Sequence, residues 1–272
     1  MTAVNLGNQL NQIVFAARAA MFDQGELAQL TYGAFDIAAR SMQESGQEEI
    51  EVTFPVGFKA DKTAIQSTKK YRQDELLAKY QFLAFQQLSI NGILQLVTLV
   101  EAMLSDVLRS VVVRYPHKIG GKRAIPVQSI LLSTSMEEVH LRATDALLNE
   151  LSYKSPGEFA EAMEQFLSIN LLECPAFHCY VEVKASRDVF IHNRGIANDV
   201  YARKSGSHAR VRSGMQLPAN TQYFMESYEY CLQVADWLEE QLHGHWHSSA
   251  YEARNQPQLE MSVGPAEPNP AA

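Results

Sequence analysis

A short polar segment, KASRDVFIHNRG, lies within a helical pattern of otherwise buried character. It contains Arg187 and His192, and each is followed by a polar residue, Asp188 and Asn193 respectively. A histidine can transfer protons near neutral pH, and a guanidinium group stabilises charge on a phosphate. Together they suit cleavage of a phosphodiester, which needs no metal ion if the RNA 2′-hydroxyl is the nucleophile. The alternative is a capped helix in which the Arg and the His make only structural hydrogen bonds.

Helical spacing decides which of these side chains can meet. Asp188 and His192 are four residues apart, so the carboxylate is predicted to orient the imidazole. Arg187 and Arg194 are seven apart and are predicted to share a face, and residues 189–191 are predicted to be buried. Arg187 and His192 are five apart, about 140° around a helix of 3.6 residues per turn. They converge on one ligand only if the helix end loosens or a second subunit completes the site.

Glu101 is a second candidate, because it interrupts the apolar run Leu99-Val-Glu-Ala-Met-Leu104. A carboxylate inside an apolar helix needs a partner, and Arg187 or Arg194 could supply it. The alternative is an acid that faces solvent where the helix emerges from the core.

The charge is unevenly distributed. The 272 residues carry a formal net charge of −8, which argues against nucleic acid as a partner. Windows 107–136 and 184–212 each carry +5, however, which leaves −18 on the rest of the chain. Such windows can contact phosphates, and the alternative is a solvated basic face. The predicted RNA-binding residues are Lys122, Arg123, Lys184, Arg203 and Lys204.

The elements that position these residues are predicted to be almost entirely helical. Helices are expected at 5–20, 25–42, 71–114, 135–153, from 155, at 177–194 and from 220 or 221 to 244. Polar and apolar residues alternate over residues 48–54, which favours a strand or an extended arm that ends at Pro55 and Gly57. The long central helix is expected to kink near Asn91-Gly92, residues 202–218 to form a loop, and residues from 247 to be disordered.

The pattern Arg187-x4-His192, with Asp188 and Asn193 after the two key residues, resembles the signature of the HEPN superfamily. The central helix with Glu101, two capped helices, the RDVFIHNRGI segment and a terminal helix also follow a HEPN layout. The resemblance implies an all-α bundle over residues 73–246, with an N-terminal extension (1–72) and a tail (247–272).

The resemblance also implies an activity, that of a metal-independent endoribonuclease acting as a stress or phage-defence effector or toxin. Arg187 would contact the scissile phosphate, His192 would be the general acid or base, and Asp188 and Asn193 would position them. Two protomers would form a composite site, and a neutralising antitoxin or regulator would be a further partner. The alternative is a catalytically silent dimeric module that binds nucleic acid or a protein.

Other classes of function have little support. No apolar run of about 18 residues is present, no signal peptide is recognisable, and three cysteines are too few for a disulfide framework, so a cytoplasmic protein is expected. No Walker A or dinucleotide motif occurs, and no cofactor is expected. Neither His243-Gly-His-Trp-His247 nor Cys174-x3-His-Cys179 has the ligand set of a closed metal site, so no metal is expected.

Overall fold

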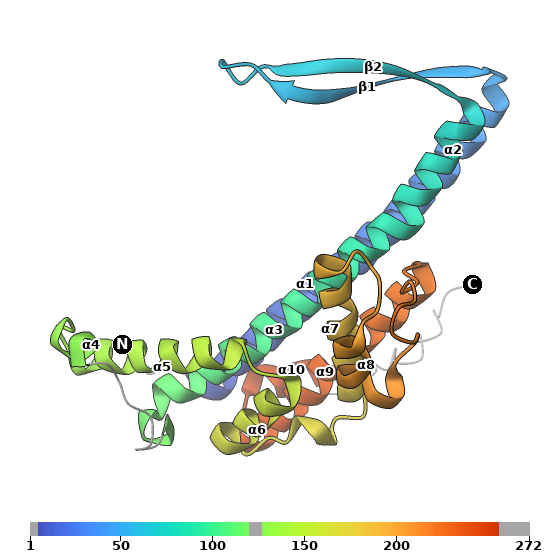
Figure 1. Ribbon diagram of the computed structural model, residues 1–272. Helices are drawn as coiled ribbons and strands as arrows, with labels where there is room; N and C mark the ends of the chain where they lie inside the picture. The colour runs from blue at the N-terminus through green and yellow to red at the C-terminus, as the bar shows by residue number, and fades with distance from the viewer. Residues whose placement is uncertain (1–4, 120–126, 256–272) are drawn as a thin grey trace, which may run out of the picture.

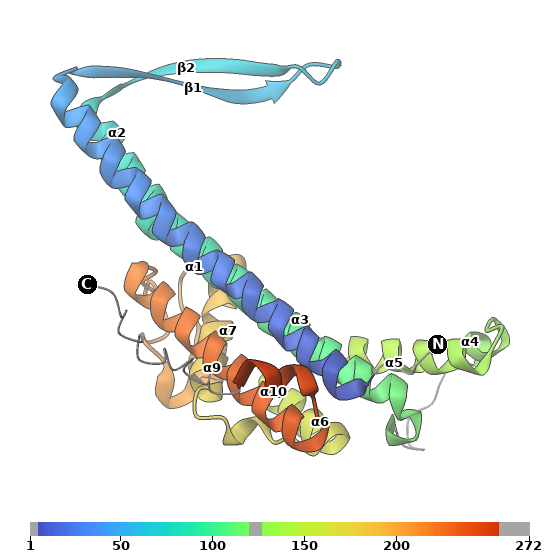
Figure 2. The same ribbon diagram turned by 180° about the vertical axis from the view of Figure 1, so that it is seen from behind.

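The computed structural model describes residues 5–119 and 127–255, and these residues are mostly helical, as predicted. Two long antiparallel helical rods form a stalk (Figures 1 and 2). The first rod is α1 (Leu6–Ser45). The second runs through α2 (Gln73–Gln81), a π-helical turn (Phe82–Gln87) and α3 (Leu88–Arg114). The stalk carries a β-hairpin at one end, and the remaining helices pack at the other.

The prediction of two separate N-terminal helices is wrong. Helix α1 is continuous, from the cap at Asn5 to the left-handed Gly46. Its buried residues Leu10, Val14, Met21 and Ala28 keep one helical period across the expected break. Gly25, which suggested the break, lies instead against the ring of Tyr228 in α9.

The predicted kink near Asn91-Gly92 is also misplaced. The irregularity in the second rod is the π-helical turn at Phe82–Gln87, and Gly92 lies within regular α3. A Cβ at Gly92 would overlap the buried ring of Phe224 in α9. This glycine therefore permits the close approach of two helices and does not bend the chain.

The β-hairpin consists of β1 (Glu49–Phe58) and β2 (Ala64–Arg72), paired antiparallel from Glu49 opposite Arg72 to Phe58 opposite Ala64. The extended segment 48–54 is thus confirmed. Its predicted end is wrong, because β1 continues through Pro55 and Gly57 with an irregularity in register between them. The hairpin projects away from the helices (Figure 1), and most of its side chains are exposed, although Tyr71 is buried where β2 approaches α2.

The helices packed on the stalk enclose the core. They are α4 (Val127–Leu131), α5 (Met136–Ser152), α6 (Pro156–Leu167), α7 (Phe177–His192), α8 (Asp199–Ser205), α9 (Thr221–His245) and α10 (Ser249–Asn255). Short 3-10 turns occur at Pro116–Ile119, Leu171–Glu173 and Gly206–His208. The predicted caps are confirmed at Ser135, at Asn220 and in the full capping box of Ser155 and Glu158.

Two predictions for the C-terminal part are wrong. The first residues of the predicted loop 202–218 belong to α8, whose last turn is held by packing of the buried Tyr201. The predicted tail contains α10, which packs on α1. Arg254 of α10 contacts the buried carboxylate of Glu239 and donates to Oδ1 of Asn11 at 2.8 Å. These polar partners order residues whose composition resembles that of a tail.

Candidate functional site

Helix α7 carries the candidate site and packs against α3, α8 and α9. Tyr180 and Val183 belong to the main core, while Ala185 and Val189 join a smaller cluster with Tyr201 of α8. With so many of its side chains buried, α7 has little freedom to rotate. The polar residues between these positions are therefore held in defined directions.

The carboxylate of Glu101 on α3 links two cations of α7. Its Oε1 lies 2.5 Å from Nζ of Lys184 and its Oε2 lies 2.6 Å from Nη2 of Arg187. Of the two partners predicted for Glu101, Arg187 is confirmed and Arg194 forms no ion pair with it among the described residues. The pairing with Lys184 was not foreseen. The Arg187 side chain is only 19% exposed, so the guanidinium is held in one place beside α3.

Asp188 extends this arrangement, which we call the Glu101 cluster: Glu101, Lys184, Arg187, Asp188 and Lys204. The Asp188 carboxylate lies 3.4 Å from Nη1 of Arg187 and 3.1 Å from Nζ of Lys204 on α8. It forms no hydrogen bond or ion pair with His192 among the described residues, so the predicted Asp188–His192 pair is wrong. The nearby lysine and arginine attract the carboxylate more strongly than a neutral imidazole would.

His192 is the last residue of α7, and its side chain is exposed. After it the chain turns sharply, with positive φ at Arg194 and Gly195. The amide of Gly195 donates to the carbonyl of Val189 at 3.1 Å, and the Asn193 side chain donates to the carbonyl of Ile196. Asn193 therefore holds the turn that follows His192.

Two predictions near this turn are wrong. Arg194 lies outside the helix, so it does not share the face of Arg187; it borders a shallow cleft with Gln216 and Pro218. Ile191 was expected to be buried and is 48% exposed. The helix ends one residue later, and none of the elements in the described part of the chain buries this side chain.

The predicted RNA-binding residues are only partly brought together. Lys184 and Lys204 lie in the Glu101 cluster, and Arg203 is exposed on α8. Lys122 and Arg123 lie outside the described residues. The Glu101 cluster has three cations and two carboxylates, so it retains one net positive charge.

Sequence reasoning missed a buried carboxylate one turn before the motif. Glu182 is 4% exposed and accepts hydrogen bonds from Ser186 (2.6 Å), Tyr201 (2.7 Å) and Tyr223 (2.8 Å). Nε of Arg210 lies 3.2 Å from the same carboxylate. Burial, followed by the charge of Glu182, raises the pKa of Tyr223 well above its usual value. These five residues, the Glu182 cluster, join α7, α8, α9 and the segment before α9. The sequence did contain a signal for this buried carboxylate, because Glu182 lies between the apolar residues Tyr180-Val181 and Val183.

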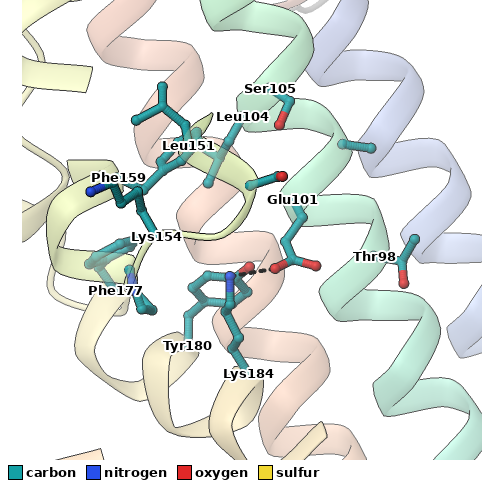
Figure 3. Close-up of a pocket in the computed structure, with 13 residues that line it drawn as sticks. Thr98, Glu101, Leu104, Ser105, Leu151, Lys154, Phe159, Phe177, Tyr180 and Lys184 are labelled. Carbon is teal, nitrogen blue, oxygen red and sulfur yellow. Dashed lines mark ion pairs between the residues drawn. The ribbon is translucent and has the colours of Figure 1, made fainter. Parts of the chain in front are cut away.

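A cavity of about 310 Å³ lies on the other side of Glu101, and we call it the Tyr180 cavity (Figure 3). Elements α3, α5, α6 and α7 all contribute to its wall. The Tyr180 hydroxyl is fully buried and has no hydrogen-bond partner among the described residues. In Figure 3 the Tyr180 and Lys184 side chains both extend from α7 toward Glu101. Burial and the nearby charge of Glu101 raise the pKa of Tyr180 well above its usual value.

Replacing Tyr180 with Phe is expected to raise the free energy of unfolding by about 1 kcal/mol, because a buried donor without a partner is removed. Tyr223→Phe is the matched control: its hydroxyl donates to the Glu182 carboxylate at 2.8 Å, so its loss should lower stability by about 1.5–3 kcal/mol, the usual contribution of a hydrogen bond to a charged group. Urea denaturation of the two variants measures both values. A destabilised Tyr180→Phe variant would show that its hydroxyl has a bonding partner in solution.

A separate group of residues could hold a metal ion. Ligand atoms of His243, His247 and Glu252 all lie within 4.8 Å of one another, at the junction of α9 and α10. His245, part of the expected histidine group, is not among them. The Ser248 amide donates to Nδ1 of His243 at 3.2 Å, which leaves only Nε2 of that ring for another partner. In the other candidate group, Cys174-x3-His-Cys179, the Cys179 side chain contacts His208, with 3.7 Å between Sγ and Nδ1.

Comparison with known proteins gives no match to a protein-family model, to a curated protein or to a solved structure. Within residues 5–119 and 127–255, no helix has the length and apolar character needed to cross a membrane.

Proposed function

We propose that this chain is a metal-independent endoribonuclease, with a HEPN-type helical bundle over residues 73–246. The observation that carries the proposal is the placement of Arg187. Glu101 and Asp188 hold this guanidinium on the helix that ends at the exposed His192. A preorganised cation beside a proton-transfer group is what phosphodiester cleavage requires.

The chemistry uses the RNA's own 2′-hydroxyl as nucleophile. A histidine removes the proton, the 2′-oxygen attacks the phosphorus, and the bond to the 5′-oxygen breaks as that oxygen receives a proton. The products are a 2′,3′-cyclic phosphate and a 5′-hydroxyl end. Arg187 stabilises the charge that develops on the phosphate, while His192 supplies proton transfer.

Two features favour a composite site in a homodimer. Arg187 and His192 point about 140° apart around α7, given 3.6 residues per turn. The exposed apolar residues near His192 suit a second copy as the covering surface: Ile191 (48% exposed), Ile196 (44%) and Val200 (44%). In this proposal the protein acts in the cytoplasm as a stress or phage-defence effector. Its partners are RNA, which it cleaves, and an antitoxin or regulator, which controls it.

One observation favours a second candidate function, a catalytically silent dimeric module that binds nucleic acid or a protein. Two carboxylates already contact the Arg187 guanidinium, and Lys204 completes the chain of ion pairs. An arginine this well paired contributes to helix packing even without a substrate.

Turnover distinguishes the two functions. Purified protein is incubated with varied RNAs in excess EDTA, alongside Arg187→Ala and His192→Ala variants purified in the same way. We expect cleavage by the wild type that leaves 2′,3′-cyclic phosphate ends and is lost in both variants. Equal cleavage by all three proteins would identify a contaminant. No cleavage by the wild type would favour the silent module.

A further inference from the structure

A shallow cleft of about 470 Å³ lies beside the turn that follows His192, and we call it the Arg194 cleft. Its walls come from three parts of the chain: the end of α7, the segment just before α9, and the π-helical turn with the start of α3. In the described part of the chain, none of its lining residues is acidic and Arg194 is the one cation among them. An anion that enters this cleft therefore meets no carboxylate on its walls.

The guanidinium of Arg194 is available to such an anion. Its side chain is exposed, and it makes no ion pair or hydrogen bond with residues 5–119 or 127–255. Arg187, on the same helix, is by contrast already paired with Glu101 and Asp188. A guanidinium matches a phosphate group through two parallel N–H donors. A phosphate can thus bind Arg194 without displacing a carboxylate.

The backbone around the cleft is irregular on two of its sides. Arg194 has a φ of 52°, in the left-handed region, where a side chain is strained and where glycine or asparagine usually follows a helix. Gln86 and Gln87 line the cleft from the π-helical turn, and such turns often occur at functional sites. A turn alone would be served better by glycine at position 194, so we look to binding for the role of the arginine.

The rest of the lining suits a nucleotide better than a free phosphate ion. Ile90, Phe190 and Leu217 give the cleft an apolar part, against which a flat base can pack. The side-chain amides of Gln86 and Gln216 are exposed and have no hydrogen-bond partner among the residues that the structure describes. An amide both donates and accepts, as the edge of a base does. A phosphate ion would use the guanidinium and leave these groups without a role.

The chain itself places the cleft close to the proposed reaction. Arg194 follows His192 by two residues, so their Cα atoms are at most about 7 Å apart. We propose that the Arg194 cleft binds the nucleotide beside the cleaved bond of a single-stranded RNA, with Arg194 on its phosphate. This inference rests on the proposed function, because it takes RNA as the source of the nucleotide.

The experiment measures RNA binding without turnover. A short single-stranded RNA is titrated with the full chain carrying His192→Ala, by fluorescence anisotropy at several salt concentrations. Adding Arg194→Gly should weaken binding about tenfold, the loss of one charge-assisted contact. It should also reduce the slope of log affinity against log salt by about 0.7, the value for one phosphate of a single strand. Arg194→Lys keeps the charge and should keep the slope.

Further variants separate this role from that of the turn. Glycine adopts a positive φ without strain, so Arg194→Gly should melt at the same temperature as its parent or higher. Arg194→Asn is a second neutral variant that tolerates this conformation, and it should bind RNA as weakly as Arg194→Gly. Arg40→Ala is the matched control, because it removes an exposed arginine of α1 that does not line the cleft. It should leave the affinity and the slope unchanged.

A competition arm identifies the source of the phosphate. Inorganic phosphate and uridine 5′-monophosphate are added against the labelled RNA, and both should compete far more weakly than unlabelled RNA. A mononucleotide that binds as tightly as RNA, and loses affinity in Arg194→Gly, would overturn RNA as the source and leave a free nucleotide as the ligand.

The remaining outcomes decide separate claims. Losses of affinity and of slope in both neutral variants support the proposal. Unchanged binding in both, a loss of affinity with an unchanged slope, or a parent protein that binds no RNA would overturn it. Cleavage by the wild-type protein is scored independently: RNA that binds through Arg194 but is never cut would overturn the endoribonuclease proposal alone.

Discussion

Replacing Glu182 with Ala is expected to lower the free energy of unfolding by about 3–5 kcal/mol, the usual cost of removing one partner of a buried ion pair. The substitution leaves the Arg210 charge without its carboxylate and removes the acceptor of the Tyr201 and Tyr223 hydroxyls. Since Tyr201 and Tyr223 belong to different helices, the loss should loosen α8 and α9 around α7 together.

Two further variants isolate the cause. Glu182→Gln keeps the shape and one acceptor oxygen, so it should cost less than Glu182→Ala while still losing the charge pair. Glu229→Ala removes an exposed carboxylate of α9 whose hydrogen bond within the described residues is to Gln233, and it should change stability by about 0.5 kcal/mol or less. Urea denaturation with circular dichroism measures all three. Equal small effects at Glu182 and Glu229 would mean that the Glu182 cluster is hydrated in solution.

The local elements of the candidate site could be predicted because their signals lie close together in sequence. Helix α7 ends close to Gly195, the residue expected to stop it. Ser135, Ser155 and Asn220 cap helices at the positions that the local sequence patterns predicted. The Glu101–Arg187 pair spans 86 residues and could still be inferred, because a carboxylate in an apolar helix requires a partner and few cations were suitable.

Longer-range features escaped prediction for a common physical reason. The second strand of the hairpin, AIQSTKKYR, has no apolar alternation, because most of the ribbon lies outside the core and Tyr71 is the one buried residue of this strand. Helix α10 forms in a sequence of tail-like composition because Arg254 donates hydrogen bonds to Asn11, 243 residues before it, and to Glu239 of α9, 15 residues before it. Such tertiary partners do not alter the local pattern that sequence reasoning uses.

The charge windows show the same limit in electrostatic terms. Lys184, Lys204 and Arg210 count as three positive charges in window 184–212, yet each lies beside a carboxylate. Glu101 comes from 83 residues before Lys184, outside the window altogether. A phosphate approaching α7 must therefore compete with Glu101 and Asp188 for Arg187. The sum over a window overestimates the attraction for RNA, and salt-dependent binding should involve fewer phosphates than the window's charge suggests.

Arg187→Ala and His192→Ala are each expected to lower RNA cleavage about 100-fold or more, the typical contribution of a positioned proton-transfer or charge-stabilising group. The rates are measured with labelled RNA in EDTA. Matched controls are Arg109→Ala, which removes an exposed ion pair with Asp145, and His245→Ala, which removes an exposed histidine at the end of α9. Both controls should cleave at the wild-type rate.

Mixing the two inactive variants tests whether one site is shared between protomers. If Arg187 of one copy acts with His192 of the other, a mixed dimer of Arg187→Ala and His192→Ala protomers contains one intact pair and one pair with both residues missing. Random exchange makes half of the dimers mixed, so the mixture should recover about a quarter of the wild-type rate, given two equivalent sites in a two-fold dimer. If both residues act within one protomer, no combination restores an intact pair. Recovery therefore requires the composite site, and a mixture as inactive as its two components, under conditions where subunit exchange is verified, would contradict it.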